Sequence, residues 1–152
     1  MSFVSVLRNT EVFRRLSDEE LGKVVRLCTR QSYEAGTQLS QQGKEIRNLY
    51  VVEEGLVQFH IEIGPGRSWA VDSSGKDECF GWAALLEPPH TWASSARCVE
   101  GTTLVVVGGT KLRELCQREP HIGYAVMLGT AQVLRQRLNH ARVQVVHLAE
   151  RM

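Results

Sequence analysis

The chain has 152 residues, of which 43% are hydrophobic and 23% are charged, and its formal net charge is +1. A chain of this length can bury roughly two-thirds of the surface of its unfolded state within one domain. The nearly balanced charge creates no overall field that would attract nucleic acid or an acidic membrane, which argues against direct DNA binding.

The first residues and the cysteines bear on the cellular compartment. The segment MSFVSVLRNTEVF lacks both a basic stretch and a long apolar stretch, so we expect no signal peptide. No apolar run approaches the length needed to span a bilayer. The four cysteines are widely spaced, with no C-x-x-C pair: Cys28, Cys79, Cys98 and Cys116. We interpret them as buried, reduced thiols of a cytoplasmic protein, with no metal or disulfide role.

Two helices are predicted in the first 30 residues. Leu7 to Leu16 is expected to form a short helical lead-in. Ser17 is then an N-cap with Glu20 three residues later, which is the pattern of a capping box. The apolar residues that follow recur at helical spacing: Leu21, Val24, Leu27 and Cys28. They predict a second helix that ends near Arg30.

From Gln31 to Gly108 the pattern changes to short apolar segments separated by glycine-containing turns, which predicts β-strands. The predicted strands are Tyr33–Ser40, Leu49–Val52, Leu56–Ile63, Ser68–Asp72, Trp92–Val99 and Thr102–Val107. Many short strands at this spacing are typical of a β-sandwich or barrel.

The stretch Phe80–Val99, FGWAALLEPPHTWASSARCV, interrupts the strands. Gly81 permits a tight bend, and the apolar run Trp82–Leu86 is long enough for about one helical turn. Pro88 and Pro89 are expected to end that turn, because proline cannot continue a helix. A strand, a glycine corner and a free helix N-terminus leave backbone N–H groups unpaired, and such groups can bind an anion.

Two further helices are predicted at the C-terminal end. Thr110 can cap the first, which carries Leu112 and Leu115, and Pro120 opens the second. Along the second, apolar residues alternate at spacings of four and three through three heptads: Met127, Ala131, Leu134, Leu138, Ala141, Val145 and Leu148. These residues form an apolar seam that is only two positions wide in each heptad. A seam this narrow favours packing of the helix against the same helix of a second subunit, and hence a homodimer, over packing against the barrel of its own chain.

One local pattern of the chain is formed by Phe80-Gly81, Ala84-Leu85 and Ser94-Ser95-Ala96. This pattern resembles the phosphate-binding cassette of the cyclic-nucleotide-binding domain. This domain occurs in the catabolite-activator and FNR superfamily, and its cassette reads roughly F-G-E-x-A-L, a loop, then R-[ST]-A-[ST]-V. Gln42-Gly43 and the segment Leu49–Val57 are also similar to the family's pattern. The resemblance therefore covers nearly the whole chain.

The resemblance implies an α+β domain. Residues 1–119 would form a sensor domain of N-terminal helices and a roughly eight-stranded antiparallel jelly-roll barrel, and residues 120–152 a long C-terminal dimerisation helix of the same domain. The cassette residues implied to contact a ligand are Phe80, Gly81, Trp82, Ala83, Ala84, Leu85, Trp92, Ala93, Ser94 and Ser95. Arg137 and Asn139 are weaker candidates, because the last helix of the family can lean over the ligand.

Two charged residues of the family's cassette are missing here. Its glutamate, which holds the ribose hydroxyl, falls on Trp82, and its arginine, which pairs with the cyclic phosphate, falls on Trp92. We therefore expect Trp82 on the ribose side of the pocket and Trp92 near the phosphate position, where each indole either stacks on a ligand or fills the pocket. Arg97 is expected on the opposite face of its strand and His90 in a solvent-facing loop, so neither is a good replacement for the arginine.

These observations predict a regulatory module that senses a cyclic nucleotide (cyclic AMP or cyclic GMP) or another small ligand, binds it weakly or in an altered mode, and signals through its C-terminal helix. The alternatives are a dimerisation or interaction module that binds no ligand and works through a separate effector protein, or the sensor half of a catabolite-activator-type transcription regulator without its DNA-binding domain. A haem or iron–sulfur sensor would have to use the isolated His60, His90 or Cys28. We expect no enzymatic activity, since no catalytic motif appears. We also expect no membrane association, since no apolar run is long enough to span a bilayer.

Overall fold

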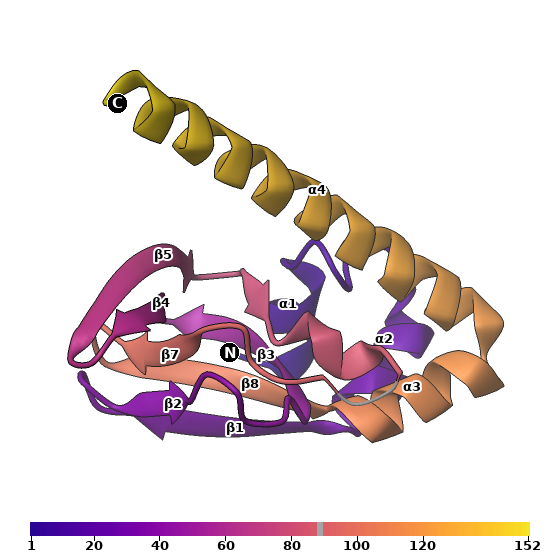
Figure 1. Cartoon of the computed structure of the whole chain (residues 1–152). Helices are drawn as coiled ribbons and strands as arrows, with labels where there is room; N and C mark the ends of the chain where they lie inside the picture. The colour runs from indigo at the N-terminus through magenta and orange to yellow at the C-terminus, as the bar shows by residue number, and fades with distance from the viewer. Residues whose placement is uncertain (88–89) are drawn as a thin grey trace.

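The computed structural model describes residues 1–87 and 90–152, and the prediction that Pro88 and Pro89 end the cassette turn lies outside the described residues. The fold is a mixed one, in which two four-stranded antiparallel sheets are joined to N-terminal and C-terminal helices (Figure 1). This arrangement confirms the predicted α+β class and the predicted number of strands. Among the described residues, no helix is both long and apolar enough to cross a membrane.

The N-terminal helices are α1 (Phe3–Arg8) and α2 (Asp18–Val25). The predicted capping box is present, because the Ser17 hydroxyl accepts from the backbone N–H of Glu20 and the Glu20 carboxylate accepts from that of Ser17. The lead-in helix lies earlier than predicted, and turns follow it up to Leu16. The prediction that the second helix reaches Arg30 was wrong, since Cys28 already pairs with Val107 in a sheet. Sheet hydrogen bonding here overrides a helical spacing of apolar residues.

Successive strands along the chain alternate between the two sheets except for the fourth and fifth, which form a hairpin in the second sheet, as expected for a jelly roll. The first sheet has the order β1-β8-β3-β6 and the second β2-β7-β4-β5. Their bounds are β1 Cys28–Tyr33, β2 Gln38–Ser40, β3 Asn48–Glu54, β4 Leu56–Gly64, β5 Arg67–Gly75, β6 Cys79–Phe80, β7 Ser95–Cys98 and β8 Thr102–Gly108.

Two predicted strands differ from the structure. The predicted strand Tyr33–Ser40 is divided, because a turn separates β1 from β2. The strand predicted from Trp92 begins only at Ser95, since Trp92 donates its backbone N–H to Lys44 and accepts from Gly43 instead of joining the sheet. This pairing ties the backbone of Trp92 to the loop that precedes β3.

Side chains are buried in two apolar cores. The smaller core lies between the sheets, where Phe80 and Leu104 of the first sheet meet Phe59 and Ala96 of the second. The larger core lies on the other face of the first sheet and combines α1, α2 and the C-terminal helices, with Phe13 and Ile122 among its fully buried members. The helices therefore cover the first sheet, and the second sheet closes the barrel.

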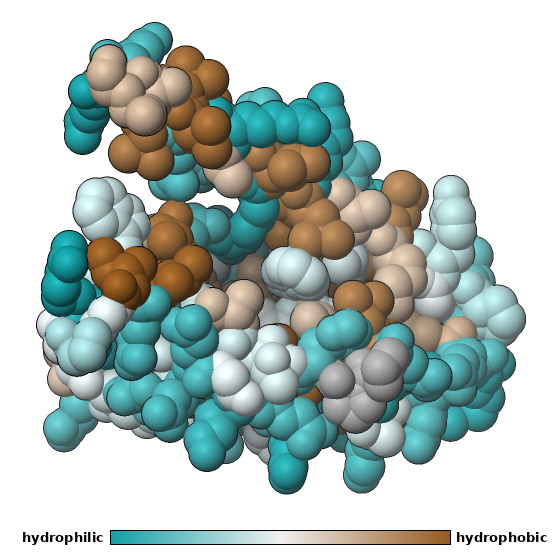
Figure 2. Space-filling model, viewed as in Figure 1, coloured by the Kyte–Doolittle hydropathy of each residue, from teal (hydrophilic) through white to brown (hydrophobic). Residues whose placement is uncertain are grey.

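The C-terminal helices are α3 (Gly109–Arg118) and α4 (Pro120–Glu150). Pro120 opens α4 as predicted, but Thr110 lies inside α3, whose N-cap is Gly108. The far end of α4 stands away from the barrel (Figure 1). Hydrophobic side chains gather along this part of α4 and on the β4–β5 hairpin beneath it (Figure 2).

Candidate functional site

The cassette segment has a sharp corner at Gly81. The corner connects β6 to a single 3-10 turn, η1 (Trp82–Leu85), and Gly81 takes the left-handed backbone values φ 77° and ψ 19°. A Cβ at this position would lie 2.5 Å from the carbonyl oxygen of Asn48 and 3.3 Å from the indole of Trp92. Glycine is therefore required both by the backbone conformation and by the close approach of β3.

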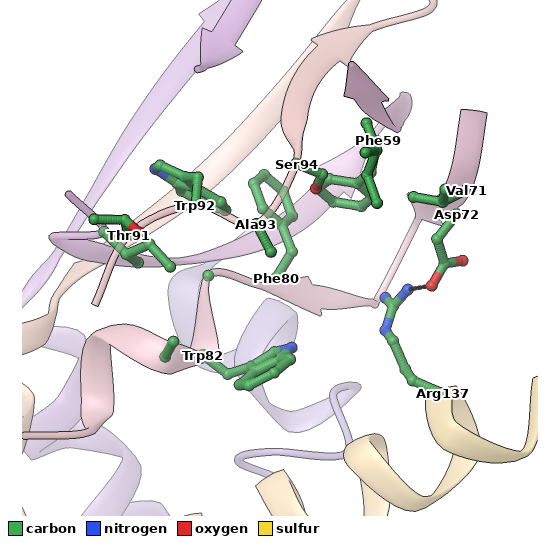
Figure 3. Close-up of a pocket in the computed structure, with 14 residues that line it drawn as sticks. Phe59, Val71, Asp72, Phe80, Trp82, Thr91, Trp92, Ala93, Ser94 and Arg137 are labelled. Atoms are coloured by element: carbon green, nitrogen blue, oxygen red, sulfur yellow. Dashed lines mark hydrogen bonds and ion pairs between the residues drawn. The ribbon is translucent and has the colours of Figure 1, made fainter. Parts of the chain in front are cut away.

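A cavity of about 300 Å³ lies beside this corner. Its walls come from the cassette, from both sheets and from α4, and they are predominantly apolar or aromatic (Figure 3). The lining residues are Ile46, Phe59, Ile61, Val71, Asp72, Phe80, Gly81, Trp82, Ala83, Thr91, Trp92, Ala93, Ser94 and Arg137. A volume of this size can hold a small organic ligand.

Most of the cassette residues singled out from the sequence line this cavity, and so does Arg137. Ala84 and Leu85 do not, because these two residues of η1 are buried in the protein interior. Ser95 lies outside the lining and accepts a hydrogen bond from the backbone N–H of Gln42 at 3.0 Å. Asn139 is exposed on α4 and does not line the cavity.

Several lining residues were not picked out from the sequence. They are Ile46, Phe59, Ile61, Val71, Asp72 and Thr91. Their contribution depends on how β4 and β5 curve over the cassette, and no local motif reports that curvature. An apolar residue in a strand shows only that one face is buried, without showing which cavity that face borders.

Trp92, which the sequence resemblance aligns with the family's arginine, belongs to an aromatic cluster. Its ring centroid lies 6.3 Å from those of both Tyr50 and Phe80, and the rings of Tyr50 and Phe80 stack at 4.9 Å. Phe59 meets Phe80 edge-on at 5.3 Å. This end of the cavity is therefore an apolar wall. The cations nearest in sequence do not replace the arginine, since Arg97 and His90 are exposed and line no part of the cavity.

At the α4 side of the cavity, a charged pair closes the lining. The Arg137 guanidinium donates to the carboxylate of Asp72 on β5 and, through Nη2, to the hydroxyl of Ser74 at 2.8 Å. Figure 3 shows this pair and Trp92 at opposite sides of the pocket. Arg137 thus joins the last helix to the barrel at the edge of the cavity.

None of the four cysteines is among the described residues that line the cavity. Burial raises the pKa of Cys79 to about 12 and that of Cys28 to about 12, so both stay protonated and unreactive at neutral pH. All four cysteines are free. Within residues 1–87 and 90–152, no three histidine, cysteine or acidic residues come together in a way that would hold a metal ion.

Comparison with known proteins identifies the domain. A family model described as "Cyclic nucleotide-binding domain" matches residues 30–119. A Rhodopseudomonas palustris protein described as a potassium channel protein is 27% identical over 118 residues, which is 78% of this chain and 28% of the relative. The chain thus spans little more than a quarter of that relative's length.

Solved structures agree in fold. A Geobacter metallireducens protein described as cyclic nucleotide-binding is 25% identical, with a TM-score of 0.78 over 91% of this chain and 99% of that one. The catabolite activator protein of Thermus thermophilus is 26% identical, with a TM-score of 0.75 over 92% of this chain and 63% of that one. The sensor domain of the transcriptional regulator DNR from Pseudomonas aeruginosa shares the fold at 17% identity, with a TM-score of 0.73 over 91% and 95%. Since the family model covers more than half of the chain, this protein belongs to the cyclic nucleotide-binding domain family.

Proposed function

We propose that this chain is a regulatory module that binds a small ligand, a cyclic nucleotide or a compound of similar size, in the cavity beside Gly81 and signals through α4. The observation that carries the proposal is the composition of the cavity wall. The cassette contributes Trp82 and Ala83 to it, and α4 contributes Arg137. A ligand there would touch both the corner that defines the family and the helix that leaves the domain.

Binding of an ordinary cyclic nucleotide should be weak. A charged hydrogen bond between a guanidinium and a phosphate contributes about 1.5–3 kcal/mol, so the loss of the cassette arginine lowers affinity roughly ten- to a hundredfold. Trp82 and Trp92 both line the cavity and present faces on which a purine can stack. Stacking then replaces part of what the missing charges would contribute.

Calorimetric titration tests this function. Cyclic AMP, cyclic GMP and cyclic dinucleotides are added to the purified protein, and thermal melting is followed in parallel. We expect heat and a raised melting temperature for at least one of them at concentrations up to millimolar, because a ligand that binds only the folded state stabilises it. No heat and no shift with any of them would reject cyclic nucleotides as the ligand of this cavity.

A second candidate function is an interaction module that binds no ligand, and the aromatic cluster of Trp92, Tyr50 and Phe80 favours it. The double variant Trp82→Glu plus Trp92→Arg separates the two. If the cavity keeps its shape, the restored charges should raise cyclic AMP affinity at least tenfold. Trp69→Arg is the matched control, since Trp69 is 57% exposed and lies outside the cavity lining.

We further propose that a second copy of the chain pairs with α4. The apolar seam on its distal half supports this, because Leu138, Val145 and Leu148 are each more than half exposed in the single chain. A row of exposed aliphatic side chains at heptad spacing is what a partner helix covers in a coiled coil. Movement of α4 would then change the geometry of the pair.

A further inference from the structure

The charge on the cavity wall lies away from the cassette. Among the described lining residues, Asp72 and Arg137 are the charged ones, and neither belongs to the cassette segment. The opposite side is the apolar wall around Trp92 (Figure 3). A ligand that carries charge therefore has one place in this cavity where the charge can be met.

The charged groups at this side of the cavity differ in how many of their hydrogen-bonding positions already have partners within the protein. Asp72 accepts from the backbone N–H of Ser73 through Oδ1 at 2.8 Å and from Arg137 through Oδ2. Glu78 accepts from the backbone N–H of Gly75 at 2.9 Å and lies 4.0 Å from Arg137. Both carboxylates are thus already engaged with donors.

Arg137 keeps unused donor capacity. Its Nη1 and Nη2 donate to Asp72, to the carbonyl of Ser73 and to Ser74, but its Nε makes no hydrogen bond with any described residue. The side chain is only 21% exposed, so its guanidinium is partly shielded from water. The open hydrogen-bonding position at this end of the cavity is therefore a charged donor, which favours an anion over a cation.

We propose that Arg137 is the anion-recognising residue of this cavity, and that its ligand is a small anion with an aromatic or apolar body. This inference rests on the proposed function of the cavity. The ligand's body packs against Trp82, Val71 and Phe59, and its anionic group pairs with the guanidinium through Nε and Nη2. The anion occupies the edge of the guanidinium that Asp72 leaves open, and its negative charge repels the Asp72 carboxylate, so its binding weakens the hold of β5 on α4.

A pair of fluorescent probes tests the proposal without a nucleotide. Anilinonaphthalene sulfonate has an aromatic body and an anionic group, and phenylnaphthylamine has the same body without the charge. Both are titrated into the full chain and into Arg137→Gln, Asp72→Asn and the control Arg135→Gln, which alters an exposed arginine of the same helix. Thermal melting checks that each variant is folded, and Arg137→Met, which also removes the charge, replaces Arg137→Gln if that variant is not.

Arg137→Gln should weaken binding of the sulfonate roughly ten- to a hundredfold and change binding of the neutral probe less than about twofold. Asp72→Asn should strengthen sulfonate binding about two- to fivefold, because the carboxylate that repels the anion is gone. Arg135→Gln should change neither. Equal losses for both probes, unchanged sulfonate binding in Arg137→Gln, or no binding of either probe would overturn the proposal. The nucleotide titrations are independent of these results, so a failure to bind cyclic nucleotides would reject only those ligands.

Discussion

The two halves of α4 are built for different tasks. In the first half, residues 120–130, which we call the docked half, Ile122, Ala125, Val126 and Gly129 are buried against the rest of the domain. In the second half, residues 131–150, which we call the free half, Leu138, Val145, Val146 and Leu148 are 51–64% exposed. One continuous helix thus begins as part of the core and ends with exposed aliphatic side chains among polar ones.

The junction between these halves lies beside the cavity. Gly129 is the last glycine of the docked half, where a Cβ would lie 2.4 Å from the carbonyl oxygen of Glu11. Two turns later Arg137 binds Asp72, and Gln144 donates to the carbonyl of Val71 at 3.4 Å. The free half is therefore tied to β5 by a few polar contacts, while the docked half is held by packing. A ligand that alters those contacts would move the free half alone.

The largest expected effect concerns the free half. Leu134→Glu plus Leu138→Glu should convert a dimer into monomers, because paired chains would bury four carboxylates at an apolar seam. Sedimentation equilibrium measures the mass. The control is Gln136→Glu plus His140→Glu, which places charges at the same spacing on exposed positions outside the seam. An unchanged mass in the seam variant would refute the helix pair.

The docked half should respond through stability instead. Gly129→Ala should lower the free energy of unfolding by about 2 kcal/mol, because the new methyl group overlaps the backbone of Glu11 and Val12. Gly22→Ala is the matched control, since Gly22 is also helical but has no atom near its Cβ position. It should raise stability by about 0.5–1 kcal/mol through helix propensity. Urea unfolding measures both, and a neutral or stabilising Gly129→Ala would show that the docking is looser than described.

At the junction, a double-mutant cycle should reveal the pair of Arg137 and Asp72. The variants are Arg137→Gln, Asp72→Asn and the double variant. Their free energies of unfolding, measured with urea, should give a coupling energy of about 1 kcal/mol, as expected for a partly buried ion pair. The paired side chains are 21% and 28% exposed, so solvent screening is incomplete. Strictly additive single-variant effects would mean that the contact contributes nothing to folding.

The smallest effect concerns acid sensitivity at the start of the docked half. The backbone N–H of Ser17, and then His121 of α4, lower the pKa of Glu20. A lowered pKa in the folded state adds stability that is present above the unfolded value of about 4.3 and is lost as pH falls through the folded pKa. Urea unfolding between pH 7 and pH 3 should therefore show a shallower decline for Glu20→Gln than for the unchanged protein. Equal slopes for Glu20→Gln and the unchanged protein would contradict the assignment.

Local signals in the sequence were enough to locate the cassette, and seven of the residues predicted there line the cavity. The capping box at Ser17, the corner at Gly81 and the start of α4 at Pro120 each depend on a residue and its near neighbours. The end of α2 and the conformation of Trp92 depend on partners far along the chain, and both were predicted incorrectly. Asp72 was missed for a related reason, because an acidic residue in a strand resembles a solvent-facing one until α4 brings Arg137 to it.

The most direct test of the central claim uses the three tryptophans as built-in reporters. Trp82 and Trp92 line the cavity, whereas Trp69 is exposed outside it. The indole N–H resonances are followed by nitrogen-15 NMR during titration with cyclic AMP, cyclic GMP, cyclic dinucleotides and anilinonaphthalene sulfonate, and are assigned with single Trp→Phe variants. Movement of the Trp82 and Trp92 signals with a stationary Trp69 signal is the predicted result. If no titration moves the signals of Trp82 and Trp92, the cavity is not a ligand site.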